Sequence, residues 1–168
     1  MSSCCTESPV EQRTKFSSVH FEGDMRPHIS VSVRDIQKSM EFYSLLFGDV
    51  PVKIRDDYAK YESEEPPINL TLNLQDETFK NVNNGHFGIE VKDNSEISTV
   101  LKRFKKQKYK IDAKEDDVAC CFSVQDKIWL VDPDDNHWEV FVVTGHDAED
   151  GCGPTCICYD PETGGCEW

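Results

Sequence analysis

Two segments of this chain repeat one pattern of apolar and polar residues, and this repeat restricts the possible folds more than any other feature. The first is His28-Ile-Ser-Val-Ser-Val, and the second is His86-Phe-Gly-Ile-Glu-Val, 58 residues further on. Apolar residues occupy alternate positions in both segments, which is typical of a strand with one buried face. Asp35 and Asp93 follow at the same spacing, each ahead of apolar residues with a helical period. The repeat predicts two copies of one supersecondary unit.

Each copy is predicted to fold as a βαβββ module, over about residues 27–75 and 85–144. In the first module we expect a helix over 36–47, which Asp35 caps and Gly48 ends, and strands over 28–33, 50–54, 58–62 and 68–74. In the second we expect a helix over 95–108 and strands over 86–91, 127–131 and 137–143. The predicted fold class is α+β. The helices should cover the apolar faces of two sheets, and the polar faces should meet across a cavity.

One compact domain over residues 26–146 accounts for all of this patterned sequence. Residues 1–25 have no sustained periodicity, so we expect a flexible arm, with one short strand near Val19–Phe21. Residues 147–168 are rich in glycine, proline and acidic residues, and we expect a flexible, cysteine-rich tail.

The charge of the chain limits its partners. With 32 acidic and 18 basic residues the formal net charge is -14, which opposes binding to nucleic acid or to anionic membranes. Small molecules or cations are the expected partners, and the chain is expected to be a monomer or a homodimer. No segment has the length of a membrane span or the pattern of a signal peptide, so we expect a cytoplasmic protein with reduced thiols.

Glu139 is a single carboxylate in an apolar strand, and a buried charge of this kind needs a partner. His28 and His86 begin equivalent strands on the predicted polar faces. Two imidazoles and one carboxylate form the facial triad that binds non-haem Fe(II) and leaves coordination positions open. We therefore predict a metal site of His28, His86 and Glu139. His137 is a weaker candidate beside the turn, and the fourth symmetric position, near Asn69 or Thr71, offers no strong ligand.

Cys120 and Cys121 form a vicinal thiol pair inside the patterned sequence. Neighbouring side chains of a regular strand point to opposite faces, so the pair can hold one atom together only from a loop or a bulge. The preceding Glu115-Asp116-Asp117 favours a loop. Two thiolates suit a soft centre such as trivalent arsenic. The other six cysteines lie near the chain ends, and their role stays open between scavenging of soft ions and none: Cys4, Cys5, Cys152, Cys156, Cys158 and Cys166.

Eight segments between residues 27 and 144 together form a specific combination of motifs: His28-Ile-Ser-Val-Ser-Val, Glu41-Phe-Tyr-Ser-Leu-Leu-Phe-Gly, Asp57-Tyr-Ala-Lys-Tyr, Pro66-Pro-Ile-Asn-Leu, His86-Phe-Gly-Ile, Cys120-Cys, Val124-Gln-Asp-Lys-Ile-Trp and Asp132-Pro-Asp-Asp-Asn-His-Trp-Glu-Val-Phe. Through these segments the chain resembles the organoarsenical carbon-arsenic lyase and cadmium-induced protein family, which belongs to the vicinal oxygen chelate (glyoxalase, bleomycin-resistance and dioxygenase-like) superfamily. Asp135 departs from the pattern, because the superfamily turn usually has glycine there.

The resemblance implies an Fe(II)- and dioxygen-dependent enzyme that cleaves the carbon-arsenic bond of trivalent methylarsenite and of reduced aromatic arsenicals. It would release arsenite and so detoxify arsenic. By matching positions, His28, His86 and Glu139 would bind iron, and Cys120 and Cys121 would bind arsenic. Gln125, Lys127, Tyr58 and Tyr61 could line the cavity, but the sequence assigns them no role.

Two other functions remain open at this point. One is a non-enzymatic protein that sequesters cadmium or arsenite through its thiols. The other is a thiol transferase of the fosfomycin-resistance type, which resembles the family in fold and in its three-ligand metal. The transferase has no need of Cys120 and Cys121, and it would need a basic anion-binding patch that the expected cavity strands lack.

Overall fold

The structure is a computed structural model. It describes Phe21 and Pro154 together with residues 26–75, 86–120, 122–145, 159–162 and 165–166. The predicted strand near Val19, nearly all of the expected arm over 1–25, most of the tail over 147–168, and Cys121 lie outside the described residues.

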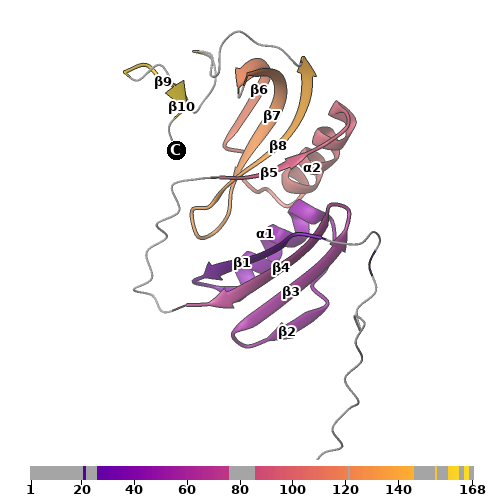
Figure 1. Cartoon of the computed structure of the whole chain (residues 1–168). Coiled ribbons are helices and arrows are strands. Elements are labelled where there is room, and N and C mark those ends of the chain that lie inside the picture. The colour runs from indigo at the N-terminus through magenta and orange to yellow at the C-terminus, as the bar shows by residue number, and fades with distance from the viewer. Residues whose placement is uncertain are drawn as a thin grey trace, which may run out of the picture.

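The described chain contains two modules with the same order of elements (Figure 1). The first consists of β1 (His28–Val33), α1 (Ile36–Phe47), β2 (Lys53–Arg55), β3 (Tyr58–Glu64) and β4 (Pro67–Leu74). The second consists of β5 (Phe87–Glu90), α2 (Asn94–Lys106), β6 (Ala113–Cys120), β7 (Ser123–Val131) and β8 (His137–Gly145). Their four-stranded sheets have the orders β1-β4-β3-β2 and β5-β8-β7-β6, each with a parallel first pair. The predicted α+β fold of two βαβββ modules is confirmed.

Both helices begin at the aspartates that the repeat singled out. Asp35 accepts a hydrogen bond from the backbone N of Lys38 at 3.1 Å, and Asp93 accepts one from the backbone N of Ser95 at 2.7 Å. These bonds satisfy amides that the first helical turn leaves without an intrahelical partner. Gly48 ends α1 with φ 70°, a left-handed conformation that glycine adopts without strain.

The predicted loop before the thiol pair is wrong. We expected a loop at Glu115-Asp116-Asp117, but residues 113–120 form β6, which pairs with β7. The pairing is irregular between Glu115 and Val118, and Asp117 has φ 54°. This strand has exposed charged side chains and therefore no apolar alternation in its sequence. Pairing with β7 satisfies the hydrogen bonds of its backbone. The tail also contains a small ladder that we did not predict, between β9 (Tyr159–Asp160) and β10 (Gly165–Cys166).

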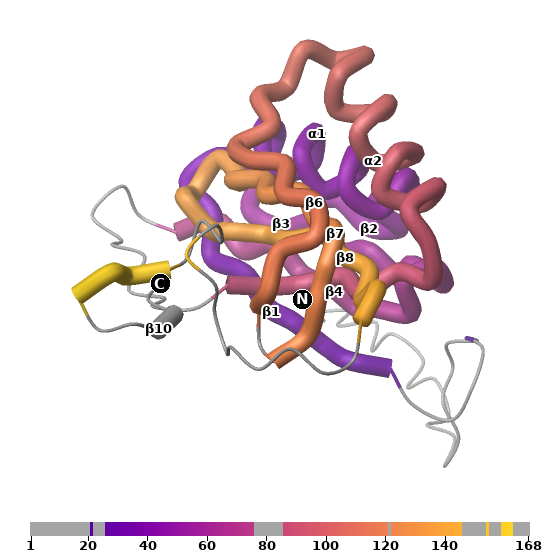
Figure 2. The backbone as a smooth tube through the Cα atoms, turned by 90° about the horizontal axis from the view of Figure 1, so that it is seen from above, coloured from indigo at the N-terminus to yellow at the C-terminus, as the bar shows by residue number. Residues whose placement is uncertain are grey.

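The two helices pack together on the apolar side of the sheets (Figure 2). They cover the apolar faces as predicted, but they lie against each other and not on opposite outer sides of the domain. Phe42 of α1 meets Phe104 of α2 with ring centroids 5.4 Å apart. Tyr43 and Phe47 of α1 reach across to Trp138 of β8, at 5.7 and 6.2 Å. These contacts join the modules through one continuous apolar core. Among the described residues, no helix is both long enough and apolar enough to span a membrane.

Polar contacts fasten the β7–β8 turn to the start of α1. The backbone N and Nε of Arg34 donate to Oδ1 of Asp134 at 2.8 and 2.9 Å. Tyr43 donates its hydroxyl to Oδ2 of the buried Asp132 at 2.7 Å. Burial raises the pKa of Asp132, although hydrogen bonds from Asn136 and Tyr43 oppose the shift. Asp135 has φ 66°, which explains why glycine is usual at this position.

We expect Tyr43→Phe to lower the free energy of unfolding by about 1–3 kcal/mol, because it leaves the buried carboxyl of Asp132 without one of its donors. Urea denaturation at pH 7 measures this loss. Tyr109→Phe is the matched control, since the Tyr109 hydroxyl is 3.4 Å from the exposed Glu41, and its effect should stay within about 0.5 kcal/mol. Equal effects of the two variants would show that the Tyr43 hydroxyl does not stabilise the fold through the buried carboxyl of Asp132.

Candidate functional site

Four side chains of the second module lie in a row on one face of its sheet, and each comes from a different strand or from the residue directly before it. They are His86, directly before β5, Glu139 in β8, Lys127 in β7 and Cys120 in β6. The strand order β5-β8-β7-β6 places their backbones in this sequence. Cα pairings of Gly88 with Glu139 and of Glu139 with Trp129 keep them on the same face, because paired residues share a face.

His86 and Glu139 meet at one end of this row. Nε2 of His86 lies 3.3 Å from Oε1 of Glu139, and the Glu139 residue is only 8% exposed. Gly88 makes room for the carboxylate, because a Cβ at that position would lie 3.1 Å from both Cγ and Oε1 of Glu139. An imidazole beside a buried carboxylate is two thirds of the predicted metal-binding triad.

Lys127 is the residue of this row whose role could not be predicted from the sequence. Its side chain is fully buried, and Nζ lies 3.1 Å from Oε2 of Glu139 and 5.3 Å from the ring centre of Trp129. The side chain of Cys120 also contributes to raising the pKa of Lys127. Strand alternation could have placed Lys127 on the face of Glu139, but its partners depend on the register between β7 and β8.

The two buried charges support one another. Burial alone would raise the pKa of Glu139, but the hydrogen bond from His86 and the attraction of Lys127 outweigh it, and this pKa lies below its ordinary value. Burial likewise opposes the charge on Lys127, yet Glu139 and Cys120 more than compensate and raise the pKa of Lys127. Both groups are therefore charged at neutral pH.

His28 lies on the other sheet and does not join the pair. It is exposed, and its Nδ1 is 3.1 Å from the backbone O of Asn69. If Nδ1 donates this bond, Nε2 is free to bind a cation. Oδ1 of Asn69 is buried and has no hydrogen-bond partner among the described residues. Within the described part of the chain, no three His, Cys, Asp or Glu side chains are grouped so that they could hold a metal ion.

Cys120 is a buried cysteine at the last position of β6, paired with Ser123 across the hairpin. The expected loop is therefore wrong for Cys120, while Cys121 lies outside the described residues. Gln125 and Ser123 donate hydrogen bonds to the backbone O of Cys120 at 3.2 and 2.9 Å. Oε1 of Gln125 is buried with no hydrogen-bond partner in this part of the structure. A hydroxyl-bearing ligand could satisfy this buried acceptor.

The remaining candidates lie elsewhere. Tyr61 is fully buried and donates its hydroxyl to the backbone O of Met40 at 2.9 Å. Burial raises the pKa of Tyr61 to about 12, so this side chain is part of the core and does not line the site. Tyr58 is half-buried in β3, and His137 begins β8 with its Nδ1 buried.

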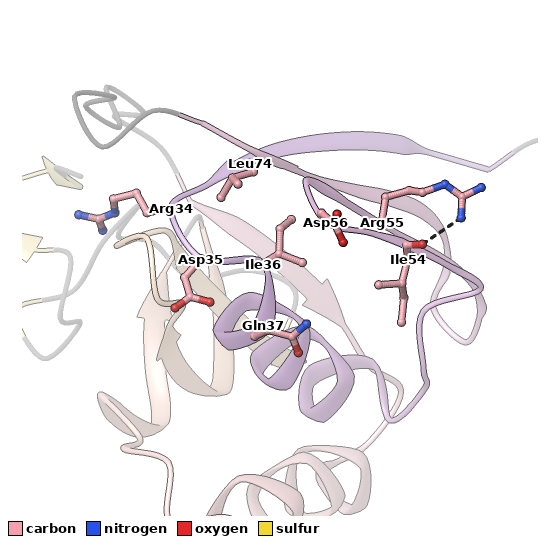
Figure 3. A pocket seen from close by; sticks show the side chains of 8 residues that line it. All are labelled: Arg34, Asp35, Ile36, Gln37, Ile54, Arg55, Asp56 and Leu74. Carbon is pink, nitrogen blue, oxygen red and sulfur yellow. Dashed lines mark hydrogen bonds between the residues drawn. The ribbon is translucent and has the colours of Figure 1, made fainter.

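Two cavities of the structure lie away from these residues. One, of about 500 Å³, opens at the start of α1 and is lined by side chains that include Arg34, Arg55 and Leu74 (Figure 3). The other, of about 350 Å³, lies where the end of α1 meets β5 and α2. Neither is lined by His28, His86 or Glu139, so neither is the predicted cavity between the polar faces.

The chain is similar to a protein family described as the Glyoxalase/Bleomycin resistance protein/Dioxygenase superfamily, whose model matches residues 26–140. It is 41% identical over 135 residues to the "Trivalent organoarsenical cleaving enzyme" of Bacillus sp. (strain MD1), which covers 80% of this chain and 83% of that relative. It is 31% identical over 129 residues to the "Cadmium-induced protein CadI" of Mycobacterium tuberculosis (strain ATCC 25618 / H37Rv), with 77% and 83% covered.

Among solved structures, the fold is similar to a glyoxalase/bleomycin resistance protein/dioxygenase from Alicyclobacillus acidocaldarius. The TM-score is 0.57 and the identity 17%, and the match covers 72% of this chain and 92% of the other. At this identity the similarity shows the fold alone.

We expect Glu139→Gln to destabilise the metal-free protein by about 3 kcal/mol at pH 7, because it removes one partner of a buried ion pair. The pKa of Glu139 is lowered on folding, so its stabilising contribution is present above the unfolded pKa, about 4.3, and is lost as the pH falls through the folded value. The difference from wild type should therefore shrink between pH 7 and pH 3 in urea titrations with a chelator present.

Glu90→Gln is the control for this experiment, because Glu90 is an exposed carboxylate on the same face of β5. Its effect should stay within about 0.5 kcal/mol at both pH values. A Glu139→Gln effect that does not change with pH would show that the Glu139 charge does not stabilise the fold.

Proposed function

Because this chain belongs to the glyoxalase/bleomycin resistance protein/dioxygenase superfamily, and within it to the family of trivalent organoarsenical cleaving enzymes and cadmium-induced proteins, we propose that it cleaves the carbon-arsenic bond of trivalent organoarsenicals. The proposed substrates are methylarsenite and reduced aromatic arsenicals. The product is arsenite, and the role is arsenic detoxification in the cytoplasm.

One observation carries the proposal: an imidazole-carboxylate pair and a buried thiol lie on the same face of one sheet, joined through a lysine. A carboxylate beside an imidazole suits a divalent transition metal, and a thiol suits trivalent arsenic. Held on one face, a captured arsenical and a metal would react within one assembly instead of by chance encounter.

The proposed metal is Fe(II), held by His86, Glu139 and His28. The first two already lie together, and both have donor atoms suited to iron. If Nδ1 of His28 donates to the backbone O of Asn69, Nε2 can bind the metal. Bound Fe(II) would supply the activation of dioxygen that this reaction needs.

The side chains of the chain itself have separate tasks. Cys120, with Cys121, would bind the arsenic atom and present the carbon-arsenic bond to the metal side of the face. When the first thiol binds arsenic, one hydroxyl leaves as water and one stays on arsenic until the second thiol displaces it. Gln125 would accept a hydrogen bond from this remaining hydroxyl through Oε1, which has no hydrogen-bond partner among the described residues. The neighbouring Trp129 is fully buried and, with Lys127, excludes water from this end of the face.

Purified protein with Fe(II), methylarsenite and air is expected to release arsenite, which arsenic speciation measures, and anaerobic protein is not. The rate of arsenite release should fall by about 100-fold or more in His86→Ala, Glu139→Ala and Cys121→Ser, since each variant lacks a side chain that would bind the metal or the arsenic directly. Far-UV circular dichroism confirms that the variants fold. Full activity of Cys121→Ser would remove thiol capture from the mechanism, and equal anaerobic activity would exclude a dioxygen-dependent reaction.

The same assay separates the two alternatives. Replacement of Cys152, Cys156, Cys158 and Cys166 by serine should leave turnover unchanged, whereas a sequestering protein would lose its protection of cells against arsenite or cadmium. Transfer of a thiol to fosfomycin, without arsenite release, would identify a transferase.

His28→Ala is expected to weaken Co(II) binding by about 10-fold or more, as loss of an imidazole ligand should. Unchanged binding would exclude His28 as the third ligand.

Equal mixtures of His28→Ala and Glu139→Ala chains then show whether His28 binds the metal in its own chain or in a second copy. Recovery of Co(II) binding in the mixture requires that His28 comes from a second copy, and no recovery places all three ligands in one chain.

A further inference from the structure

A buried lysine connects the two halves of the proposed site. The Lys127 side chain has no exposed surface, and Nζ lies 3.1 Å from Oε2 of Glu139. Cys120, also buried, lies on the same face of the neighbouring strand β6 and helps to raise the pKa of Lys127. Lysine is almost never fully buried unless its charge is paired, so the carboxylate of Glu139 accounts for its position.

Glu139 divides its two carboxylate oxygens between two neighbours. Oε1 faces Nε2 of His86 at 3.3 Å, and Oε2 faces Nζ of Lys127 at 3.1 Å. A carboxylate held in this way cannot rotate without breaking both contacts. Oε1 is thereby kept at the position where a metal bound by His86 would meet it, and Oε2 is kept away from that position.

The ammonium is itself fixed by its surroundings. Nζ lies 5.3 Å from the ring centre of Trp129, a fully buried side chain in the same strand. Trp129 donates its indole N–H to Glu115 of β6 at 2.8 Å, which holds the ring in place. An ammonium over an aromatic face in a dry environment gains a further favourable interaction.

We infer that Lys127 is a shared positioning residue, which aims Glu139 at the metal and at the same time activates the sulfur of Cys120 for arsenic. This inference rests on the proposed function, because it takes its metal and thiol sites from there. A cation beside sulfur favours the thiolate, and the thiolate is the form that attacks soft electrophiles. One side chain would thus prepare both ends of the reacting face.

Lys127→Met tests the metal end, since methionine keeps much of the volume and removes the charge and the donors. Titration with Co(II) should show an affinity about 10–100-fold weaker than wild type, the usual effect of losing a hydrogen bond to a ligating carboxylate. Lys114→Met is the matched control, because Lys114 is an exposed lysine of the neighbouring β6 that pairs with Asp116, and its affinity should equal that of wild type.

A lysine that served only as a counter-charge would give the opposite result. The metal would then replace the missing charge, so Lys127→Met would bind Co(II) as tightly as wild type or more tightly, and the inference would be overturned. Should Lys127→Met not fold, Lys127→Arg carries the same test, because it keeps the charge but displaces the donor, and it should weaken binding in the same direction.

Alkylation of Cys120 tests the thiol end. In a Cys121→Ser background, iodoacetamide modification of the Cys120 peptide, followed by mass spectrometry at pH 7 without metal, should be at least about fivefold slower in Lys127→Met than in Lys114→Met. Equal rates would show that Lys127 serves Glu139 alone and would overturn the shared role.

These readouts do not depend on turnover, so they separate this inference from the proposed function. Wild-type protein that binds Co(II) but releases no arsenite would overturn the proposed function, while the Lys127 comparison would still decide its own question. Wild-type protein that binds neither Co(II) nor Fe(II) would overturn both.

Discussion

The buried carboxylate of Glu139 is the group on which the second module's polar face depends. A charge at 8% exposure is tolerated only with close partners, and the sheet supplies them from both neighbouring strands. His86 approaches one oxygen and Lys127 the other. The ion pair keeps a chemically useful group charged inside the protein, where an isolated acid would be protonated. The ordered row from His86 to Cys120 follows from this requirement.

The first module fixes the position of the strand that carries Glu139 through a different set of contacts. Its helix α1 packs on its own sheet and on Trp138, while the Tyr43 hydroxyl and Arg34 hold the turn that leads into β8. Glu139 lies seven residues beyond Asp132, in the strand that this turn begins. The apolar core and the polar turn together therefore set the position of the strand that carries the carboxylate. His28, on the open polar face of the other sheet, is held by its backbone contact to Asn69 and not by this network.

The predictions from the sequence were correct for elements whose local residue pattern specifies one secondary structure. Alternating apolar residues gave β1 and β5, and the aspartates at 35 and 93 gave the starts of both helices. Prediction failed at β6, because a strand whose outer residues are charged has no apolar alternation to detect. It also failed to group Tyr61 with the core, since a tyrosine in a strand has the same sequence pattern whether its hydroxyl meets solvent or the backbone of a helix.

The sequence by itself determined the duplicated βαβββ fold and singled out His86 and Glu139, which the structure brings to 3.3 Å, because period and residue type are local properties of a chain. Only the tertiary structure decided that Lys127 lies between Glu139 and Cys120, because strand register, which depends on the packing of the whole sheet, sets the neighbours of a side chain across strands. The same holds for His28. Its place in the repeat made it a candidate ligand, but its separation from His86 and Glu139 among the described residues follows from the way that the modules pack through their helices.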